Sequence, residues 1–169
     1  MSQATARDLT EVPVLVTGGA GFIGSHLVDA LVERGARVTV LENFATGSSP
    51  NLAALGDRIE LIEGDIRDRE TCRDTCRERR FVFHQAALGS VPRSLDDPVT
   101  SLAVNAQGTA NLFAAAREMG VERVVYASSS SVYGDSPRLP RREAEEGEPL
   151  SPYALSKAMG ERIAQVFAR

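Results

Sequence analysis

Residues 12–24 read Val-Pro-Val-Leu-Val-Thr-Gly-Gly-Ala-Gly-Phe-Ile-Gly, a short apolar run that ends in closely spaced glycines. The run is rich in β-branched residues, which favours a strand, and the amphipathic segment 22–34 favours a helix. Strand, glycine turn and helix in this order are typical of a dinucleotide-binding unit. In that unit Gly18 permits the tight turn, Gly21 admits a pyrophosphate, and Gly24 lets the helix pack closely on the strand. A glycine-rich turn in a protein that binds no nucleotide is the alternative at this point.

The composition describes a single globular domain. The chain has 169 residues, of which 43% are hydrophobic and 25% charged, and no tryptophan. A net charge of −4 gives no reason to expect nucleic acid or an anionic membrane as a partner. Residues 1–11 are polar and are predicted to be a disordered leader, with one domain over 12–169. Because neither a signal region nor a membrane-spanning run is found, we expect a cytoplasmic protein.

Strand patterns alternate with helix patterns along the rest of the chain, which predicts an α/β fold. This Rossmann-type, doubly wound parallel sheet should have the strand order 3-2-1-4-5. Further strands are predicted at 37–41, 58–63, 81–84 and 122–127, and helices at 67–80, 98–119 and 151–169. The pattern stops after a helix, so the predicted domain lacks a carboxyl-terminal substrate domain.

Glu42 follows the second predicted strand, where a carboxylate accepts hydrogen bonds from the hydroxyls of an adenosine ribose. Its negative charge would repel a 2′-phosphate, so the sequence favours NAD over NADP; a solvated strand end is the alternative. His84 is interpreted as a packed residue rather than a base. Cys72 and Cys76 should share one helix face, and no second ligand pair accompanies them, so no metal site is predicted.

Tyr153 and Lys157 lie four residues apart on the last predicted helix, so their side chains share a face. A lysine ammonium beside a phenol favours the phenolate, which turns tyrosine into a usable base near neutral pH. Four serines at 128–131 follow a neighbouring strand, where a hydroxyl could bind the same substrate oxygen. Together with a dinucleotide site, these groups indicate hydride-transfer chemistry.

Three motifs resemble the extended short-chain dehydrogenase/reductases, specifically nucleotide-sugar 4-epimerases acting on UDP-glucose or UDP-N-acetylglucosamine. They are TGGAGFIG at 17–24, SSSSVYG at 128–134 and SPYALSK at 151–157. The segment 89–98, which begins with GSVPRS and ends with Asp97-Pro98, is similar to the UDP-N-acetylhexosamine branch. The resemblance covers residues 12–169 and suggests the amino-terminal half of such an enzyme.

The resemblance implies an isomerase with NAD as cofactor and a UDP-sugar as substrate. Tyr153 would remove the proton of the sugar 4-hydroxyl while hydride passes from C4 to NAD and later returns to the other face. Lys157 would tune Tyr153 and hold the nicotinamide ribose. Ser129 aligns with the catalytic serine or threonine of the family, although the run of serines leaves Ser130 and Ser131 as alternatives.

The resemblance also implies which residues contact the ligands. The substrate would meet Ser90, Ser129, Ser130 and Tyr153. Asp65 would accept the adenine amino group. The cofactor-binding positions would be Gly18, Gly21, Phe22, Ile23, Gly24, Glu42, Asn43, Asp65, Ile66, Gln85, Ala86, Ala87, Asn105, Tyr153 and Lys157.

Two departures from the family pattern leave alternatives open. The family often has aspartate at the position of Glu42, and its members are roughly twice as long, with most sugar-nucleotide contacts in the second half. The chain could therefore be a truncated NAD-binding domain without activity. Dehydratases carry an Asp-Glu pair where this chain has Ser130 and Ser131, which disfavours dehydration, whereas a decarboxylase stays open. The helices at 98–119 and 151–169 form a homodimer interface in the family, so a homodimer is predicted.

Overall fold

A computed structural model describes residues 9–143 and 145–168. In this part of the chain five parallel strands form one sheet in the order β3-β2-β1-β4-β5, as predicted. The strands are β1 (Pro13–Thr17), β2 (Arg37–Glu42), β3 (Ile59–Glu63), β4 (Phe81–His84) and β5 (Arg123–Tyr126). The strand order reverses beside β1, because β2 pairs with one edge of β1 and β4 with the other. Such a reversal opens a crevice at the carboxyl ends of the strands.

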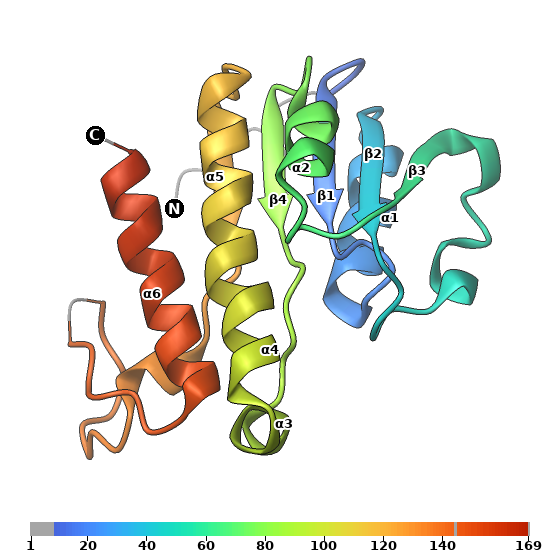
Figure 1. Ribbon diagram of the computed structural model, residues 1–169. Helices are drawn as coiled ribbons and strands as arrows, with labels where there is room; N and C mark the ends of the chain where they lie inside the picture. Colours follow the sequence, from blue (N-terminus) through green and yellow to red (C-terminus); the bar gives the residue numbers. More distant parts are fainter. Residues whose placement is uncertain (1–8, 144, 169) are drawn as a thin grey trace.

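Helices cover both faces of the sheet (Figure 1). They are α1 (Phe22–Glu33), α2 (Arg69–Cys76), α3 (Val91–Asp96), α4 (Pro98–Leu102), α5 (Thr109–Glu118) and α6 (Pro152–Phe167). On one face α1 contributes Val28 and Leu31 to a core with β1 and β2. On the other, α2 and α5 pack against each other, and α6 packs beside α5.

The predicted thiol pair lies in the second core. Cys72 and Cys76 are both fully buried on one face of α2, packed with Leu112 of α5. Burial raises the pKa of each thiol to about 12, so neither is a nucleophile at neutral pH. The prediction that the two thiols share one helix face is confirmed, and both pack into the core.

The predicted helix over 98–119 is interrupted. Asp97 caps its start by accepting the Thr100 amide, and α4 then runs into a π-helical segment, η3 (Ala103–Gly108), before α5. A π turn holds one extra residue and shifts the side chains after it. At Gly108 an added Cβ would lie 2.7 Å from Ile66 Cδ1, so the widened turn packs directly on the segment after β3.

Two further predicted segments differ from the structure by more than two residues. The predicted helix over 67–80 is shorter, because Asp68 caps α2 and Arg77 takes an extended conformation after Cys76. Of the predicted disordered leader, residues 1–8 lie outside the described residues, whereas 9–11 form a turn. The Glu11 amide donates to Gly35 O (2.9 Å), and Leu9 packs against the first core.

Candidate active site

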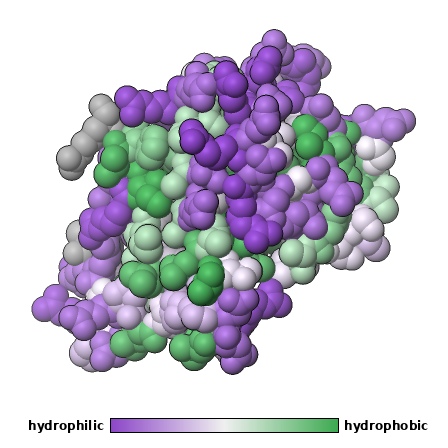
Figure 2. Space-filling model, in the orientation of Figure 1, coloured by the Kyte–Doolittle hydropathy of each residue, from purple (hydrophilic) through white to green (hydrophobic). Residues whose placement is uncertain are grey.

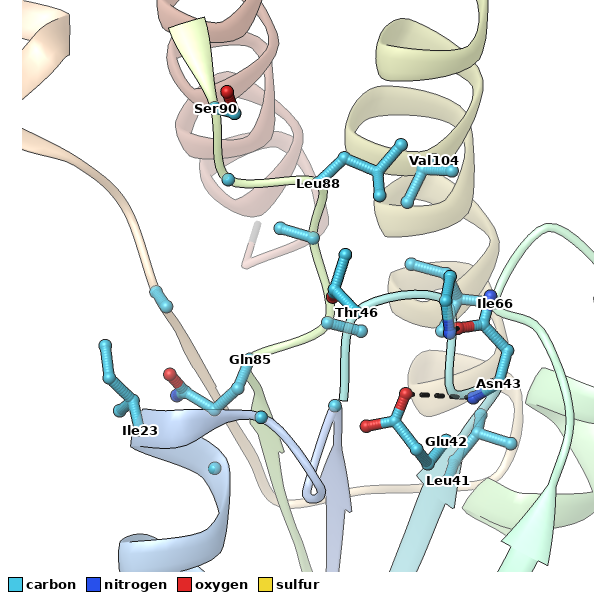
Figure 3. Close-up of a pocket in the computed structure, with 18 of the residues that line it drawn as sticks. Ile23, Leu41, Glu42, Asn43, Thr46, Ile66, Gln85, Leu88, Ser90 and Val104 are labelled. Carbon is cyan, nitrogen blue, oxygen red and sulfur yellow. Dashed lines mark hydrogen bonds between the residues drawn. The ribbon is translucent and has the colours of Figure 1, made fainter. Parts of the chain in front are cut away.

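A cleft of about 540 Å³ opens at the carboxyl ends of the strands. In Figure 3, Ile23 of α1, Glu42 at the end of β2 and Gln85 after β4 surround it. The predicted site residues that line it are Gly18, Gly21, Phe22, Ile23, Gly24, Glu42, Asn43, Ile66, Gln85, Ala86, Ala87, Ser90, Tyr153 and Lys157. Asp65, Asn105, Ser129 and Ser130 do not line the cleft.

Sequence reasoning missed several lining residues. Thr46, Arg67, Leu88, Arg93, Thr100, Val104 and Ala127 also form the wall, together with Ser128 of the predicted serine run. Ala127 and Ser128 directly follow β5, so their place after a strand end was a usable signal. Val104 lies in the π-helical segment itself, which no local pattern indicated, and Thr100 lies in α4 directly before it.

The glycine turn is packed too tightly for side chains. Gly18 has a φ of +71°, and a Cβ there would lie 2.6 Å from the Ala86 amide nitrogen. A Cβ on Gly24 would lie 2.1 Å from Gly18 O. Gly21 caps α1 without a side-chain hydrogen bond, so no side-chain oxygen competes for the first amides of the helix. An open helix start of this kind binds phosphate groups.

Glu42 is 6% exposed and holds the turn as well as the end of β2. Its Oε2 accepts the amide of Ala20 (3.0 Å), while Oε1 accepts the amides of Asn43 (3.0 Å) and Phe44 (2.9 Å). Figure 3 shows the carboxylate turned toward the cleft beside Asn43. Three amide donors leave lone-pair capacity for a further hydroxyl donor.

Asp65 is tied to its neighbours rather than presented to the cleft. Arg67 donates its Nε to Asp65 Oδ1 (3.0 Å) and its Nη2 to Oδ2 (2.7 Å), and Asn43 Nδ2 donates to Oδ2 (2.8 Å). The hydrogen bond from the Arg67 side chain is the largest cause that holds the Asp65 pKa at about 2. Arg67 lines the cleft, whereas Asp65 does not.

Tyr153 and Lys157 both reach the cleft from α6. The Lys157 ammonium donates to Ala127 O (2.8 Å) and lies 5.1 Å from the centre of the Tyr126 ring. Burial lowers the pKa of Lys157 to about 8, and no carboxylate of the described residues forms a salt bridge with it. Tyr153 is fixed through its backbone, since its amide donates to Ser94 Oγ (3.1 Å).

The serines that follow β5 have different contacts. Ser128 lines the cleft, and its hydroxyl donates to Glu161 of α6. Ser129 Oγ accepts both the amide (3.2 Å) and the hydroxyl (2.8 Å) of Ser131. A hydroxyl that accepts two hydrogen bonds keeps its own proton free to donate. Ser130 is exposed.

Asn105, which is predicted to contact the cofactor, lies behind the cleft wall. It is 1% exposed, and the π turn directs it at the backbone of Leu88. Its Oδ1 accepts the Leu88 amide (2.8 Å), and its Nδ2 donates to Leu88 O (3.1 Å) and Ser156 Oγ (3.1 Å). These three bonds use both Nδ2 protons, so Asn105 links the cleft wall at Leu88 to Ser156 of α6.

The buried His84 is expected to make the stability of the fold depend on pH. The ring is 1% exposed, and burial is the main cause that lowers its pKa from 6.5 to about 3. The folded chain therefore binds fewer protons than the unfolded chain between these values, and stability falls as the pH drops below 6.5. We expect His84 to cost unfolding free energy below pH 6.5, with a slope that rises from about half of 1.4 kcal/mol per pH unit at pH 6.5 to about 1.4 near pH 5.

Urea unfolding at several pH values measures this slope. The window from pH 6.5 to about 5 lies above the titration of Asp65, whose pKa is 3.8 in the unfolded chain and about 2 in the folded chain. His26, the other histidine, is exposed, so His26→Gln should leave the slope unchanged and His84→Gln should remove it. A slope that survives in His84→Gln would assign the pH dependence to other groups.

Comparison with known proteins identifies the family of this chain. Residues 14–169 match the NAD dependent epimerase/dehydratase family. The chain belongs to that family. Among the described residues, no three His, Cys, Asp or Glu side chains lie together so that they could hold a metal ion. No helix in the described part of the chain is long and apolar enough to cross a membrane.

Individual family members match over about half their length. A putative UDP-glucose 4-epimerase of Methanocaldococcus jannaschii is 39% identical, covering 92% of this chain and 51% of that protein. The UDP-N-acetylglucosamine 4-epimerase of Methanobrevibacter ruminantium has a TM-score of 0.89 at 37% identity, covering 94% of this chain and 51% of that one. The dTDP-glucose 4,6-dehydratase of Streptomyces venezuelae, solved with NAD, has a TM-score of 0.89 at 36% identity, covering 94% and 52%.

Proposed function

We propose that the chain is the NAD-binding half of a UDP-sugar 4-epimerase acting on UDP-glucose and UDP-galactose or their N-acetylated counterparts. One observation carries the proposal: a single cleft joins the glycine turn and Glu42 to Tyr153 and Lys157. The epimerases among the relatives support the reaction. Because the chain spans about half their length, the rest of the sugar-nucleotide pocket would come from the half it does not match.

The residues present fit a dinucleotide. A Cβ at Gly18 or Gly24 would collide with backbone atoms, so the glycines keep the turn close to the α1 amides that would hold the pyrophosphate. Glu42 would accept the adenosine ribose hydroxyls and repel a 2′-phosphate. When bound, NAD supplies a nicotinamide that takes up hydride from the sugar and returns it. Asp65 would reach the adenine amino group only while it also binds Arg67 and Asn43.

The protein groups would move the proton. Tyr153 would take the proton of the sugar 4-hydroxyl as base. Lys157 keeps two ammonium protons beyond its bond to Ala127 O, enough to stabilise the phenolate and to bind ribose hydroxyls. Ser129 would donate its free hydroxyl proton to the 4-oxygen, and Ser90 and Ser130 would contact the substrate further out.

Product analysis tests the proposal. The chain would be assayed alone, and as a fusion to the carboxyl-terminal half of the Methanocaldococcus jannaschii relative, with NAD and UDP-glucose or UDP-N-acetylglucosamine. We expect 4-epimers from the fusion and little turnover from the chain alone. A fusion that releases only a 4-keto-6-deoxy sugar would instead support a dehydratase, as in the Streptomyces venezuelae neighbour. Because decarboxylation needs a uronic acid, UDP-glucuronic acid is assayed as well; a pentose as the only product would support a decarboxylase.

A homodimer through α4, η3, α5 and α6 is part of the proposal. Apolar side chains gather on the surface formed by α3, α4 and α6 (Figure 2). Val99 is 76% exposed, Leu155 44% and Met159 40%. Exposed apolar side chains gathered on one face mark protein interfaces. Light scattering is expected to give twice the chain mass, and Leu155→Glu should give the monomer; a monomer mass for the unmodified chain would contradict the dimer.

A further inference from the structure

A line of buried hydrogen bonds crosses the sheet beneath the cleft. Thr17 Oγ1 on β1 lies 2.7 Å from His84 Nδ1 on β4, and His84 Nε2 lies 2.9 Å from Thr109 Oγ1 on α5. The three side chains are 0%, 1% and 1% exposed. We name Thr17, His84 and Thr109 the clamp. Buried polar groups cost desolvation free energy that only a fully satisfied arrangement offsets.

The available N–H and O–H protons fix the direction of each hydrogen bond in the clamp. The Thr109 hydroxyl donates to Asn105 O (2.6 Å), so its oxygen must accept from His84 Nε2–H. A neutral imidazole carries one N–H, and therefore His84 Nδ1 accepts the proton of the Thr17 hydroxyl. Thr17 Oγ1 in turn accepts the Ala86 amide (3.3 Å). With the hydrogen bonds running in these directions every donor of the clamp has an acceptor, and no other set of directions achieves this.

The Thr17 end of the clamp reaches two walls of the cleft. Thr17 precedes Gly18, and a Cβ on Gly18 would lie 2.6 Å from the Ala86 nitrogen, so the glycine turn rests on the Ala86 backbone. Thr17 O also accepts the Gln85 amide (3.0 Å). Both Gly18 and Ala86 line the cleft. The position of the Thr17 side chain therefore affects how these walls meet.

We propose that His84 is a positioning residue of the dinucleotide site, which through Thr17 fixes the contact between the glycine turn and Ala86. His84 does not line the cleft; it acts by restricting Thr17 to one rotamer and one hydrogen-bond direction. A ligand that bridges both walls then meets a prearranged surface and loses less free energy to ordering it. The inference rests on the proposed NAD site.

Removal of one hydroxyl tests the clamp. Thr17→Val leaves His84 Nδ1 and the Ala86 amide without their partner while nearly keeping the side-chain shape. We expect the NAD affinity, measured by isothermal titration calorimetry, to fall at least about tenfold. Thr17→Ser restores the hydroxyl and should return the affinity to within about threefold. If Thr17→Val does not fold, Thr109→Val breaks the clamp at its other end and should lower the affinity in the same direction.

A matched control separates positioning from stability. Thr39 on β2 is 2% exposed and donates to Glu60 Oε2 (2.7 Å), outside the clamp. Thr39→Val removes a similar hydrogen bond from the same sheet, so it should lower stability comparably and leave the NAD affinity unchanged. Equal affinities of Thr17→Val and Thr39→Val, at equal stability, would overturn the proposal.

Amide hydrogen exchange of the ligand-free chain gives a second, independent readout. Thr17→Val should speed exchange of the Ala86 amide at least about tenfold relative to Thr39→Val. If the unmodified chain binds no NAD, the proposed cofactor site fails, and the exchange rate still decides whether the clamp holds Ala86. Exchange at Ala86 that Thr17→Val leaves unchanged would overturn the clamp whatever the cofactor result.

Discussion

Replacing Gly24 by alanine is expected to abolish NAD binding by this chain. The new Cβ would lie 2.1 Å from Gly18 O and 2.9 Å from Gly19 Cα, both backbone atoms that cannot rotate away. Relief requires the start of α1 to move off the glycine turn, which withdraws its amides from the phosphate position. We expect the affinity to fall at least about a hundredfold and the fold to lose roughly 2–3 kcal/mol.

Gly56→Ala is the control for this substitution. Gly56 has a φ of +48°, so alanine there is strained, yet no atom lies within 4 Å of the new Cβ. It should cost about 1 kcal/mol and leave NAD binding intact. Calorimetric titration and urea unfolding of both variants make the comparison. NAD binding by Gly24→Ala at the affinity of the unmodified chain would remove the glycine turn from the cofactor site.

Tyr153→Phe should lower the turnover of the fusion with the carboxyl-terminal half by about a thousandfold, because general base catalysis contributes factors of this size. The substitution removes only the phenolic oxygen. The Tyr153 amide keeps its bond to Ser94 Oγ, so α6 should stay in place. NAD affinity should therefore change less than about twofold.

The matched control is Tyr133→Phe. Tyr133 ends η4 (Ser130–Tyr133) with Arg141 over its ring, and it does not line the cleft. This variant should retain its turnover. Progress curves with UDP-glucose, together with NAD titrations, separate catalysis from binding. Comparable rates for Tyr153→Phe and the parent fusion would exclude Tyr153 as the base.

The part of the site that could be predicted depends on backbone rules. Gly18, Gly24 and Glu42 stand at the ends of strongly patterned elements, and the parallel topology brings those ends to one edge of the sheet. The same rule places Gln85 and Ala86 after β4. These residues line the cleft because the carboxyl ends of the parallel strands all lie at that edge of the sheet.

Residues whose role depends on side-chain partners were not predictable in this way. The π turn rotates Asn105 onto Leu88, and Arg67 takes up the Asp65 carboxylate. His84 was correctly expected to be packed, but its links to Thr17 and Thr109 join segments 67 and 25 residues apart in sequence. Long-range polar pairs leave no periodic signal in a single sequence.

Calorimetric titration of the unmodified chain with NAD and with NADP tests the central claim most directly. The claim is that the cleft between the glycine turn, Glu42, Tyr153 and Lys157 holds NAD. We expect saturable binding of NAD and at least about tenfold weaker binding of NADP, because the buried Glu42 carboxylate opposes a 2′-phosphate. Absence of NAD binding, or NADP binding as tight as NAD, would contradict the account.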